Sequence, residues 1–558
     1  MNNPQKASGK YLWKKILWPE KNFYFVTFIY AIGTSLLSLA IPISVQSLVN
    51  TVTFAVLKQP LIVVSVLLLG LLIFSGVLRA LQDLTVEYFQ RHFYARLTVH
   101  IADKILTSTQ KSVNSVYKGD LVNRYFEIMS IQKQSTKLLI DGITLVLQTI
   151  AGMFLLAFYH PYFLAFDIVL IGLIYLMWKL YGKAGIETSI YESKAKYKAA
   201  AWLEELIYNR HMFYGRKSHQ SAIKATDGHI NLYLTRRFTH FNYLFKQIIF
   251  SLCIYALMSA LILGLGGFLV MEGQLTLGQL VSAEIVVALI LTGIAKSGGY
   301  LESFYDIYAA LDKLEDFEIL QSEKELPQLE EQNSIGDGPL VFDNIAIENE
   351  NKEKYHFHHS FQKGSCYHIV IDKDCTQRTF MSLLHAHNQP KTGDIIWSGI
   401  PYEDIPLMDL REEIYLVDAP RIIQGSILDN LTWSVDKVTE SQLNHAVDAT
   451  LLSEKINNLP EGLETQIWHG CSLFRWGELI QLEFARVLLQ KPKWVVISSL
   501  FNQLRPELQK AILIELKGQN IGVMVLSFSH DEFEHCKLLF DEKLEFHQDY
   551  KKSPTPNP

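Results

Sequence analysis

The segment HIVIDKDCTQRTFMSLL, His368 to Leu384, decides how the second half of this 558-residue chain is interpreted. An apolar run, Ile369 to Ile371, ends in a polar turn, and apolar residues return at helical spacing from Phe380. These periods predict a buried strand, a turn and a helix. A phosphate-binding loop has this layout, but here the turn has no glycine and no Lys-Ser/Thr pair follows it. The segment therefore has the position of a nucleotide site without its usual residues.

Composition predicts membrane spans joined to a soluble part. Apolar residues make up 49% of the chain and charged residues 19%, and the mean hydropathy is +0.12. The net charge of −6 argues against nucleic acid as a partner, because phosphate binding favours a basic face. The five cysteines are scattered without a CxxC pair, so we expect buried free thiols, no metal site and a reducing compartment. We expect no cleavable signal peptide, since the N-terminus is polar and basic and the first apolar run is too long.

Six apolar stretches in the first 310 residues are about as long as a bilayer requires. The lysine- and tryptophan-rich KYLWKKILW before the first of them suits the membrane surface, and its charges favour a cytoplasmic N-terminus. Long charged connections follow the second and fourth spans, so we expect cytoplasmic helical extensions there and a cytoplasmic C-terminus. The expected spans are Phe23–Val49, Leu61–Leu81, Leu138–Tyr159, Tyr162–Leu180, Phe245–Val270 and Leu277–Ile294.

An acidic, Pro/Gly-containing stretch divides the chain, and after it short apolar runs such as YHIVI and WVVIS alternate with helical patterns. This alternation is typical of an α/β domain. The expected parts are an amphipathic elbow at 1–20, a six-helix transmembrane domain at 21–320, a linker at 321–339, an α/β domain at 340–548 and a disordered tail at 549–558.

Several ordered motifs give this arrangement a family resemblance. The membrane half contributes GDLVNRYFEIMSIQ, WLEELIYNR and MEGQLTLGQLVSA, and the second half contributes KTGDIIWSG, DLREEI, QGSILDNL, LPEGLETQI, FARVLLQKP and LSFSH. With these motifs the chain resembles, over nearly its whole length, an ATP-binding cassette (ABC) exporter of the half-transporter type. The resemblance implies a six-span membrane domain followed by an α/β P-loop cassette, working as a dimer.

The resemblance also assigns the phosphate loop, where this chain departs from the family. The glycine positions hold Ile371, Asp374 and Thr376, the lysine position holds Gln377, and the Mg²⁺-binding hydroxyl position holds Arg378. Backbone N–H groups, a lysine and a hydroxyl are what such a loop offers to phosphates and Mg²⁺. Together with Asp372, Asp374 also places negative charge where a polyphosphate would lie.

The other cassette motifs depart as well. Ser498 and Ser499 replace the Mg²⁺-binding aspartate and the water-activating glutamate, and a serine neither holds a divalent cation electrostatically nor acts as a base near neutral pH. Asp418 replaces the Q-loop glutamine, and the adenine-stacking position is Asn349. The signature motif becomes Arg475, Trp476, Gly477 and Glu478, and of the catalytic set the switch histidine, His530, is retained.

Family members bind each of two ATP molecules between the phosphate loop of one subunit and the signature motif of the other. Since both motifs depart from the family in this chain, each of the two sites of a dimer would contain an altered motif. We therefore expect no catalytic residues and no cofactor. If the cassette does bind nucleotide after all, its cofactors would be ATP and Mg²⁺. Another energy source would leave ionisable groups in the spans, where charge is costly. The candidates for substrate or proton binding are Glu284, Asp141 and Asp167; Arg79 and Lys296 lie near helix ends, and interfacial placement is the alternative for all but Glu284.

The sequence thus favours a multi-pass protein of the bacterial inner membrane, a transporter of the ABC exporter family acting as a homodimer or heterodimer in the lipid bilayer. Its cassette would serve as a dimerisation and coupling platform. Two alternatives stay open: a membrane scaffold or regulatory subunit that transports nothing, and an ATP-driven exporter with unusual nucleotide contacts.

Overall fold

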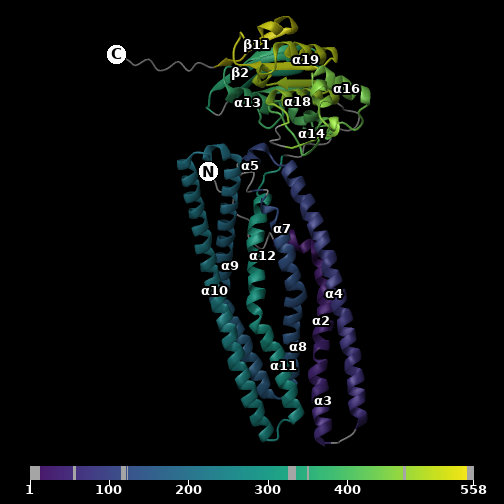
Figure 1. Cartoon of the computed structure of the whole chain (residues 1–558), viewed down its shortest axis with the longest axis vertical. Helices are drawn as coiled ribbons and strands as arrows, with labels where there is room; N and C mark the ends of the chain where they lie inside the picture. The colour runs from purple at the N-terminus through teal and green to yellow at the C-terminus, as the bar shows by residue number, and fades with distance from the viewer. Residues whose placement is uncertain are drawn as a thin grey trace, which may run out of the picture. The chain divides into compact units, whose positions relative to one another are not determined.

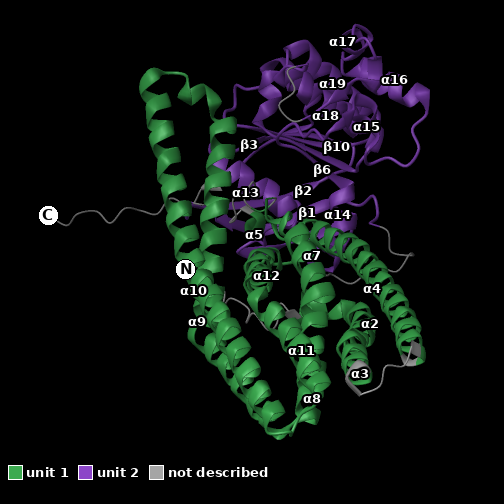
Figure 2. Ribbon diagram, turned by 60° about the horizontal axis from the view of Figure 1, so that its bottom comes forward, with its two compact units in different colours: residues 1–323 green, residues 324–558 purple. Residues whose placement is uncertain are grey.

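The computed structural model describes residues 13–54, 58–114, 121, 123–323, 335–348, 351–468 and 473–548. The chain separates into two compact units, residues 1–323 and residues 324–558, which Figure 2 colours differently. Several expected features lie outside the described residues: the first part of the elbow, the middle of the linker at 324–334, Gly119 and Asp120, Asn349, and the tail at 549–558.

The first unit is helical along its described length (Figure 1). The elbow forms two short turns, and long helices follow. The elements are η1 (Trp13–Leu17), η2 (Trp18–Glu20), α2 (Lys21–Ser38), α3 (Ala40–Phe54), α4 (Lys58–Leu106), α5 (Gln110–Asn114), α7 (Glu127–Lys137), η3 (Leu138–Gly142), α8 (Ile143–Tyr159), α9 (Pro161–Tyr208), η4 (Arg210–Phe213), α10 (Arg216–Met271), α11 (Leu277–Ala295) and α12 (Ser297–Glu318).

Six stretches among the described residues are long and apolar enough to cross a membrane, and each contains one of the expected spans. Helices α4, α9 and α10 have 49, 48 and 56 residues, more than twice the roughly 20 that a bilayer requires. These helices therefore continue beyond the hydrocarbon, as expected. The six stretches are Lys14–Thr51, Leu61–Leu106, Glu127–Tyr159, Pro161–Tyr208, Arg216–Met271 and Leu277–Ala295.

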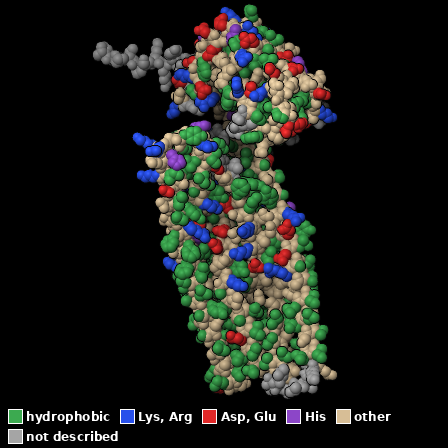
Figure 3. Space-filling view, in the orientation of Figure 1, with side chains coloured by type: hydrophobic (Ala, Val, Ile, Leu, Met, Phe, Trp, Pro, Cys, Tyr) green, Lys and Arg blue, Asp and Glu red, His purple; other side chains and the backbone are tan. Residues whose placement is uncertain are grey.

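The surface of this unit changes along its length. Figure 3 shows charged side chains gathered around the half that holds α7 and α12, whereas hydrophobic side chains dominate the face over α3, α8 and the end of α10. Large apolar side chains of α4 and α8 are exposed, such as Val63, Phe74, Phe154 and Phe158. A contiguous apolar surface of this kind is typical of contact with lipid.

The second unit contains two five-stranded sheets. One is ordered β12-β2-β1-β4-β5 and its strands pair antiparallel, and the other is parallel with the order β11-β3-β10-β9-β6. The strands are β1 (Leu340–Glu348), β2 (Lys354–Phe361), β3 (Cys366–Val370), β4 (Thr392–Trp397), β5 (Ile400–Pro401), β6 (Ile414–Val417), β7 (Gly425–Ser426), β8 (Gln466–Ile467), β9 (Trp494–Ile497), β10 (Gly522–Ser527), β11 (Glu542–Glu545) and β12 (His547–Gln548).

The helices of this unit flank the parallel sheet. They are α13 (Asp374–Leu384), η5 (Tyr402–Asp404), α14 (Leu407–Glu413), α15 (Ile427–Thr432), α16 (Glu440–Ala449), α17 (Ser453–Asn457), η6 (Gly462–Glu464), α18 (Trp476–Gln490), η7 (Ser499–Gln503), α19 (Pro506–Gly518) and η8 (Glu534–Leu539). Alternate residues of β9 explain the layers. Val495 and Ile497 pack with α18 and α19, whereas Trp494 and Val496 pack with α13 and the antiparallel sheet. Strands buried on both faces form continuous apolar runs, which is why WVVI was recognisable.

The two ends of the expected linker are packed. Ser322 forms a β-bridge with Ser108, and the backbone N–H of Gln321 donates to the Ser112 hydroxyl at 3.0 Å, so these residues belong to the first unit. Ile335 is buried in the core of the second unit. The division of the chain therefore falls at Glu323, within the expected linker.

Candidate functional site

The expected strand–turn–helix is present between β3 and α13. Strand β3 pairs with β10 on one side and β11 on the other, so its carboxyl end opens at the edge where parallel strands usually present ligands. The backbone N–H of Ile371 donates to the carbonyl oxygen of Ser527 at 2.9 Å. Helix α13 then begins at Asp374. The turn is thereby held against the end of β10.

Gln377, at the position of the family's lysine, points back into the domain. It is buried, and its side-chain nitrogen donates to the carbonyl oxygens of Ile371 and Ser527, both at 3.0 Å. A carboxamide has two N–H donors, and each of them has a backbone partner here. The side chain thus ties the turn to the neighbouring strand and has no donor left for a ligand.

Three charged side chains at the turn, Lys373, Asp374 and Arg378, form ion pairs. Arg378 forms an ion pair with Asp374 at 2.8 Å, and Lys373 pairs with Glu353. The Thr379 hydroxyl donates to the carbonyl of Cys375 at 2.8 Å, one turn back in the same helix. The hydroxyl and guanidinium groups in this region are therefore engaged within the fold.

Two further residues of the loop differ in exposure, since Asp372 is exposed whereas Thr376 is fully buried. A polar cavity of about 350 Å³ lies beside the helix and is lined by Arg378, Lys391 and Glu348, among others. Lys391 and Glu348 form an ion pair at 3.8 Å. Both cations that line the cavity are therefore paired, Lys391 with Glu348 and Arg378 with Asp374.

The serines that follow β9 act as helix-terminal residues. The Ser498 hydroxyl accepts a hydrogen bond from the backbone N–H of Leu500 at 3.3 Å and caps η7, and Ser499 is the first residue of that helix. Serine is a favoured cap because its hydroxyl satisfies an otherwise free N–H. His530 is exposed and lies 3.1 Å from a carboxylate oxygen of Glu545.

The residues at the signature position begin α18. The backbone N–H of Arg475 donates to the Glu478 carboxylate at 2.7 Å, so Glu478 closes the N-terminal turn. Trp476 is half-exposed at the first helical position, followed by Gly477. The indole therefore stands on the surface where the family presents a small serine and glycines.

Sequence reasoning missed a buried polar network next to Asp418. Glu483 is buried and accepts from the Tyr415 hydroxyl at 2.7 Å and from the backbone N–H of Arg421 at 2.5 Å. Arg486 donates to Glu483 at 2.9 Å, and Asp418 pairs with the Arg421 side chain. The segment after β6 is thus fixed to α18. The available signal in the sequence was Glu483, a charged residue within an apolar helical pattern, directly before FARVLLQKP.

The three membrane carboxylates have different surroundings. Asp141, in η3, forms an ion pair with Arg79 of α4 at 2.6 Å, and both are about half-exposed. Asp167, in α9, has both oxygens buried and without a hydrogen-bond partner among the described residues. In α11 one Glu284 oxygen is likewise buried and unpartnered within the described part of the chain. The structure therefore does not join Asp141 to the other two.

Asp167 and Glu284 lie at a similar level on two helices that flank α10. An atom added at Gly266 of α10 would meet Leu280 of α11 at 2.5 Å and Phe163 of α9 at 3.9 Å. Asp167 and Glu284 each follow those residues by four positions, which places each on the same helix face about one turn further along. Both carboxylates therefore belong to faces directed at α10.

Further polar side chains, from α3, α8 and α11, contact one another close to Glu284 in the sequence of α11. The Tyr159 hydroxyl lies 2.5 Å from the side-chain oxygen of Gln46 and 2.9 Å from the hydroxyl of Ser282, two residues before Glu284. Such groups are costly in hydrocarbon unless they pair or line a polar path. The sequence signalled Glu284 by its position within an apolar span, but it gave no sign of the contact between Tyr159 and Gln46.

Comparison with known proteins identifies the membrane half. Residues 24–294 match the family described as the ABC transporter transmembrane region. The chain is similar to the probable multidrug resistance ABC transporter ATP-binding/permease protein YheI of Bacillus subtilis, with 22% identity over 50% of this chain and 48% of that protein. It is also 22% identical to the uncharacterized ABC transporter ATP-binding protein YwjA of the same organism, over 59% of this chain and 54% of the relative.

A solved structure shares the fold. The structure of a bacterial Atm1-family ABC exporter with ATP bound superposes with a TM-score of 0.77 and 15% identity, covering 91% of each chain. At this identity the likeness shows the fold alone. The matches to the two curated relatives cover about half of their length.

Proposed function

Because this chain carries the ABC transporter transmembrane region and is homologous to ABC exporters, we propose that it is a membrane transport protein whose cassette neither binds nor hydrolyses ATP. The cassette would instead hold two subunits together and couple them. The observation that carries the proposal is Gln377, whose two N–H donors are spent on the carbonyls of Ile371 and Ser527. A lysine at this position would extend toward a phosphate, whereas this side chain is buried in its own domain.

The remaining residues of the loop do not fit Mg-ATP. Asp374 and Asp372 bring negative charge to the N-terminal end of α13, where an anion would otherwise be favoured. Arg378 is paired with Asp374, and Ser498 is a helix cap. The site therefore lacks a free cation for the phosphates and a carboxylate for the metal at the positions that the family uses.

Hydrogen bonding in the rest of the cassette supports a domain that still folds. The buried Glu483 and the partly buried Arg486 are hydrogen-bonded to each other and to backbone groups. Buried charges without such partners would destabilise the fold by several kcal/mol, on the order of 3–5. A satisfied network is what a cassette kept for a mechanical role requires.

We place the protein in the bacterial inner membrane with both termini in the cytoplasm, as a homodimer or a heterodimer with another half-transporter. The amphipathic elbow, with Lys14 and Lys15, supports this orientation by the excess of cations on the cytoplasmic side. The energy source would be an ion gradient acting on Asp167 and Glu284, whose buried oxygens have no partner among the described residues. A proton or a cation bound by Asp167 of α9 or Glu284 of α11 would neutralise the carboxylate and remove the free-energy cost of burying its charge.

A nucleotide titration tests the proposal. The full chain, purified in detergent, is titrated with a fluorescent ATP analogue and Mg²⁺, beside an ABC exporter that has an intact phosphate loop. We expect no saturable binding by the unmodified chain and normal binding by the exporter. A variant combining Gln377→Lys with Ser498→Asp is titrated in parallel. Binding gained in this variant would locate the loss at these two residues, and competitive, saturable Mg-ATP binding by the unmodified chain would overturn the proposal in favour of an ATP-driven exporter.

A further inference from the structure

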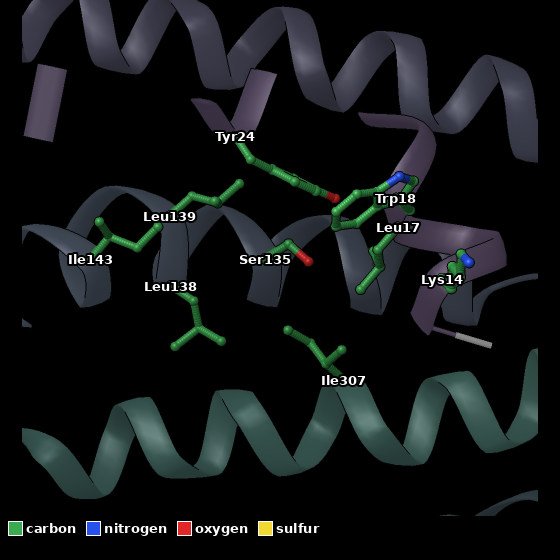
Figure 4. Close-up of a pocket in the computed structure, with 9 residues that line it drawn as sticks. All are labelled: Lys14, Leu17, Trp18, Tyr24, Ser135, Leu138, Leu139, Ile143 and Ile307. Carbon is green, nitrogen blue, oxygen red and sulfur yellow. The ribbon is translucent and has the colours of Figure 1, made fainter. Parts of the chain in front are cut away.

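An apolar cavity is lined entirely by residues of the first unit, and neither Asp167 nor Glu284 is among them. Its volume is about 760 Å³, within the range of roughly 300–1,000 Å³ that is typical of ligand sites. Four parts of the chain line it (Figure 4): the N-terminal turns, the first turn of α2, the continuous helix from α7 through η3 into α8, and α12. No part of the transport mechanism proposed above uses this space.

The wall of the cavity is hydrocarbon over most of its extent. Leu17 comes from the N-terminal turns, Leu138, Leu139 and Ile143 from the middle helix, and Ile307 from α12. Water in such a space would find few hydrogen-bond partners, so an apolar occupant is favoured. An alkyl chain suits the cavity because it needs no directional contacts.

One end of the cavity is amphipathic. Trp18 and Tyr24 line it, and Figure 4 shows the Tyr24 hydroxyl near the Trp18 ring. Trp18 is 61% exposed. Tryptophan and tyrosine are enriched at the level of lipid headgroups, since their rings bury an apolar body and keep one polar group hydrated. This end of the cavity therefore has the character of the membrane interface.

Lys14 supplies a spare positive charge at that end. Its amino group has no ion pair or hydrogen bond within the described part of the chain, although it lines the cavity. The cations around it are neutralised, since Lys15 pairs with Glu318 and Arg96 pairs with Glu20. A free ammonium beside an apolar cavity selects an occupant with a hydrocarbon chain and a negative headgroup.

We propose that this cavity binds an anionic phospholipid from the surrounding bilayer, with an acyl chain between η3 and α12 and the phosphate at Lys14. The lipid would join the N-terminal turns to α7 and α12 and stabilise the entry of the first span. Because Lys14 and Ile307 are almost 300 residues apart, the bound lipid would link distant segments of the membrane unit.

Native mass spectrometry of the purified full chain tests this proposal. The protein is titrated with phosphatidylglycerol and, separately, with phosphatidylcholine of the same acyl chains. We expect one phosphatidylglycerol to be retained per chain, about fivefold more tightly than phosphatidylcholine, as one lysine near a membrane surface would provide. Lys14→Ala should abolish the preference and Lys14→Arg should keep it.

Two further variants make the result specific. Lys183→Ala removes an exposed lysine of α9 that does not line the cavity, and it should leave the preference unchanged. Ser135→Phe fills the cavity from α7 and should reduce the retention of both lipids. Equal retention of the two lipids, an unchanged preference in Lys14→Ala, or retention that never saturates at one lipid per chain would overturn the proposal. None of these readouts depends on nucleotide binding or transport.

Discussion

The side-chain nitrogen of Gln377 lies 3.0 Å from the carbonyl oxygen of Ser527, and this contact joins the first turn of α13 to the end of β10. In a working phosphate loop the equivalent side chain is free to meet the nucleotide. Here it donates to the carbonyl oxygens of Ile371 and Ser527, so the two elements are joined by a contact within the domain. The consequences for stability and for transport can be measured separately.

Gln377→Ala should destabilise the cassette. The substitution removes the Gln377 donor from two buried carbonyl oxygens, of which that of Ser527 still accepts from the Ile371 N–H, and this loss costs about 1–3 kcal/mol of unfolding free energy. Thermal unfolding of the purified chain, followed by circular dichroism, measures the change. Gln389→Ala is the matched control because Gln389 is exposed, and it should stay within about 0.5 kcal/mol of the unmodified protein. Equal melting of the two variants would show that the Gln377 contact contributes nothing.

Acidification should weaken the cassette through His368. Burial, followed by the nearby Lys543 and His530 charges, lowers the pKa of His368 to about 4. In the unfolded chain the pKa of histidine is about 6.5, so between these values the unfolded state binds more protons and stability falls as the pH falls. The Ser527 hydroxyl donates to the carbonyl of Ser529 and therefore accepts from the neutral ring of His368 at 2.7 Å.

His368→Gln can still donate to Ser527 but does not titrate. Its melting temperature should therefore fall less than that of the unmodified chain between about pH 7.5 and about pH 5. His219→Gln, at an exposed position of α10, should not alter the pH dependence. Parallel curves for His368→Gln and the unmodified chain would exclude His368 as a source of acid sensitivity.

The sequence was sufficient for features that depend on local pattern. Span length and hydropathy predicted the six apolar stretches found among the described residues, and short continuous apolar runs predicted β3 and β9. The sequence was insufficient where the burial of a polar side chain depends on partners far away in the chain. Gln377, for example, is buried against Ser527, which is 150 residues away. For the same reason the sequence did not distinguish Lys14 from Lys15. The structure does, because Lys15 pairs with the distant Glu318, whereas Lys14 has no ion pair among the described residues.

Arg79 and Asp141 should be coupled more strongly than an ordinary surface pair. They lie 2.6 Å apart, and although each is about half-exposed, both lie in stretches that are long and apolar enough to cross a membrane. A pair facing water contributes about 0.2–1 kcal/mol and weakens with salt, whereas lipid would screen much less. We expect a coupling above about 1 kcal/mol in a double-mutant cycle of Arg79→Ala and Asp141→Ala. A coupling that disappears at high KCl would instead place the pair in water.

Asp167→Asn should increase stability and remove transport. Both oxygens of Asp167 are buried without a partner among the described residues, so the native fold bears a desolvation cost that a neutral side chain of the same shape reduces by about 1–3 kcal/mol. Glu187→Gln is the matched control on the same helix because Glu187 is exposed, and its melting temperature should not change. Uptake of the fluorescent cation ethidium into vesicles under an imposed pH gradient measures transport. A residue retained at a cost to stability is expected to serve function. If Asp167→Asn melts at a lower temperature and transports normally, the carboxylate has a structural role instead.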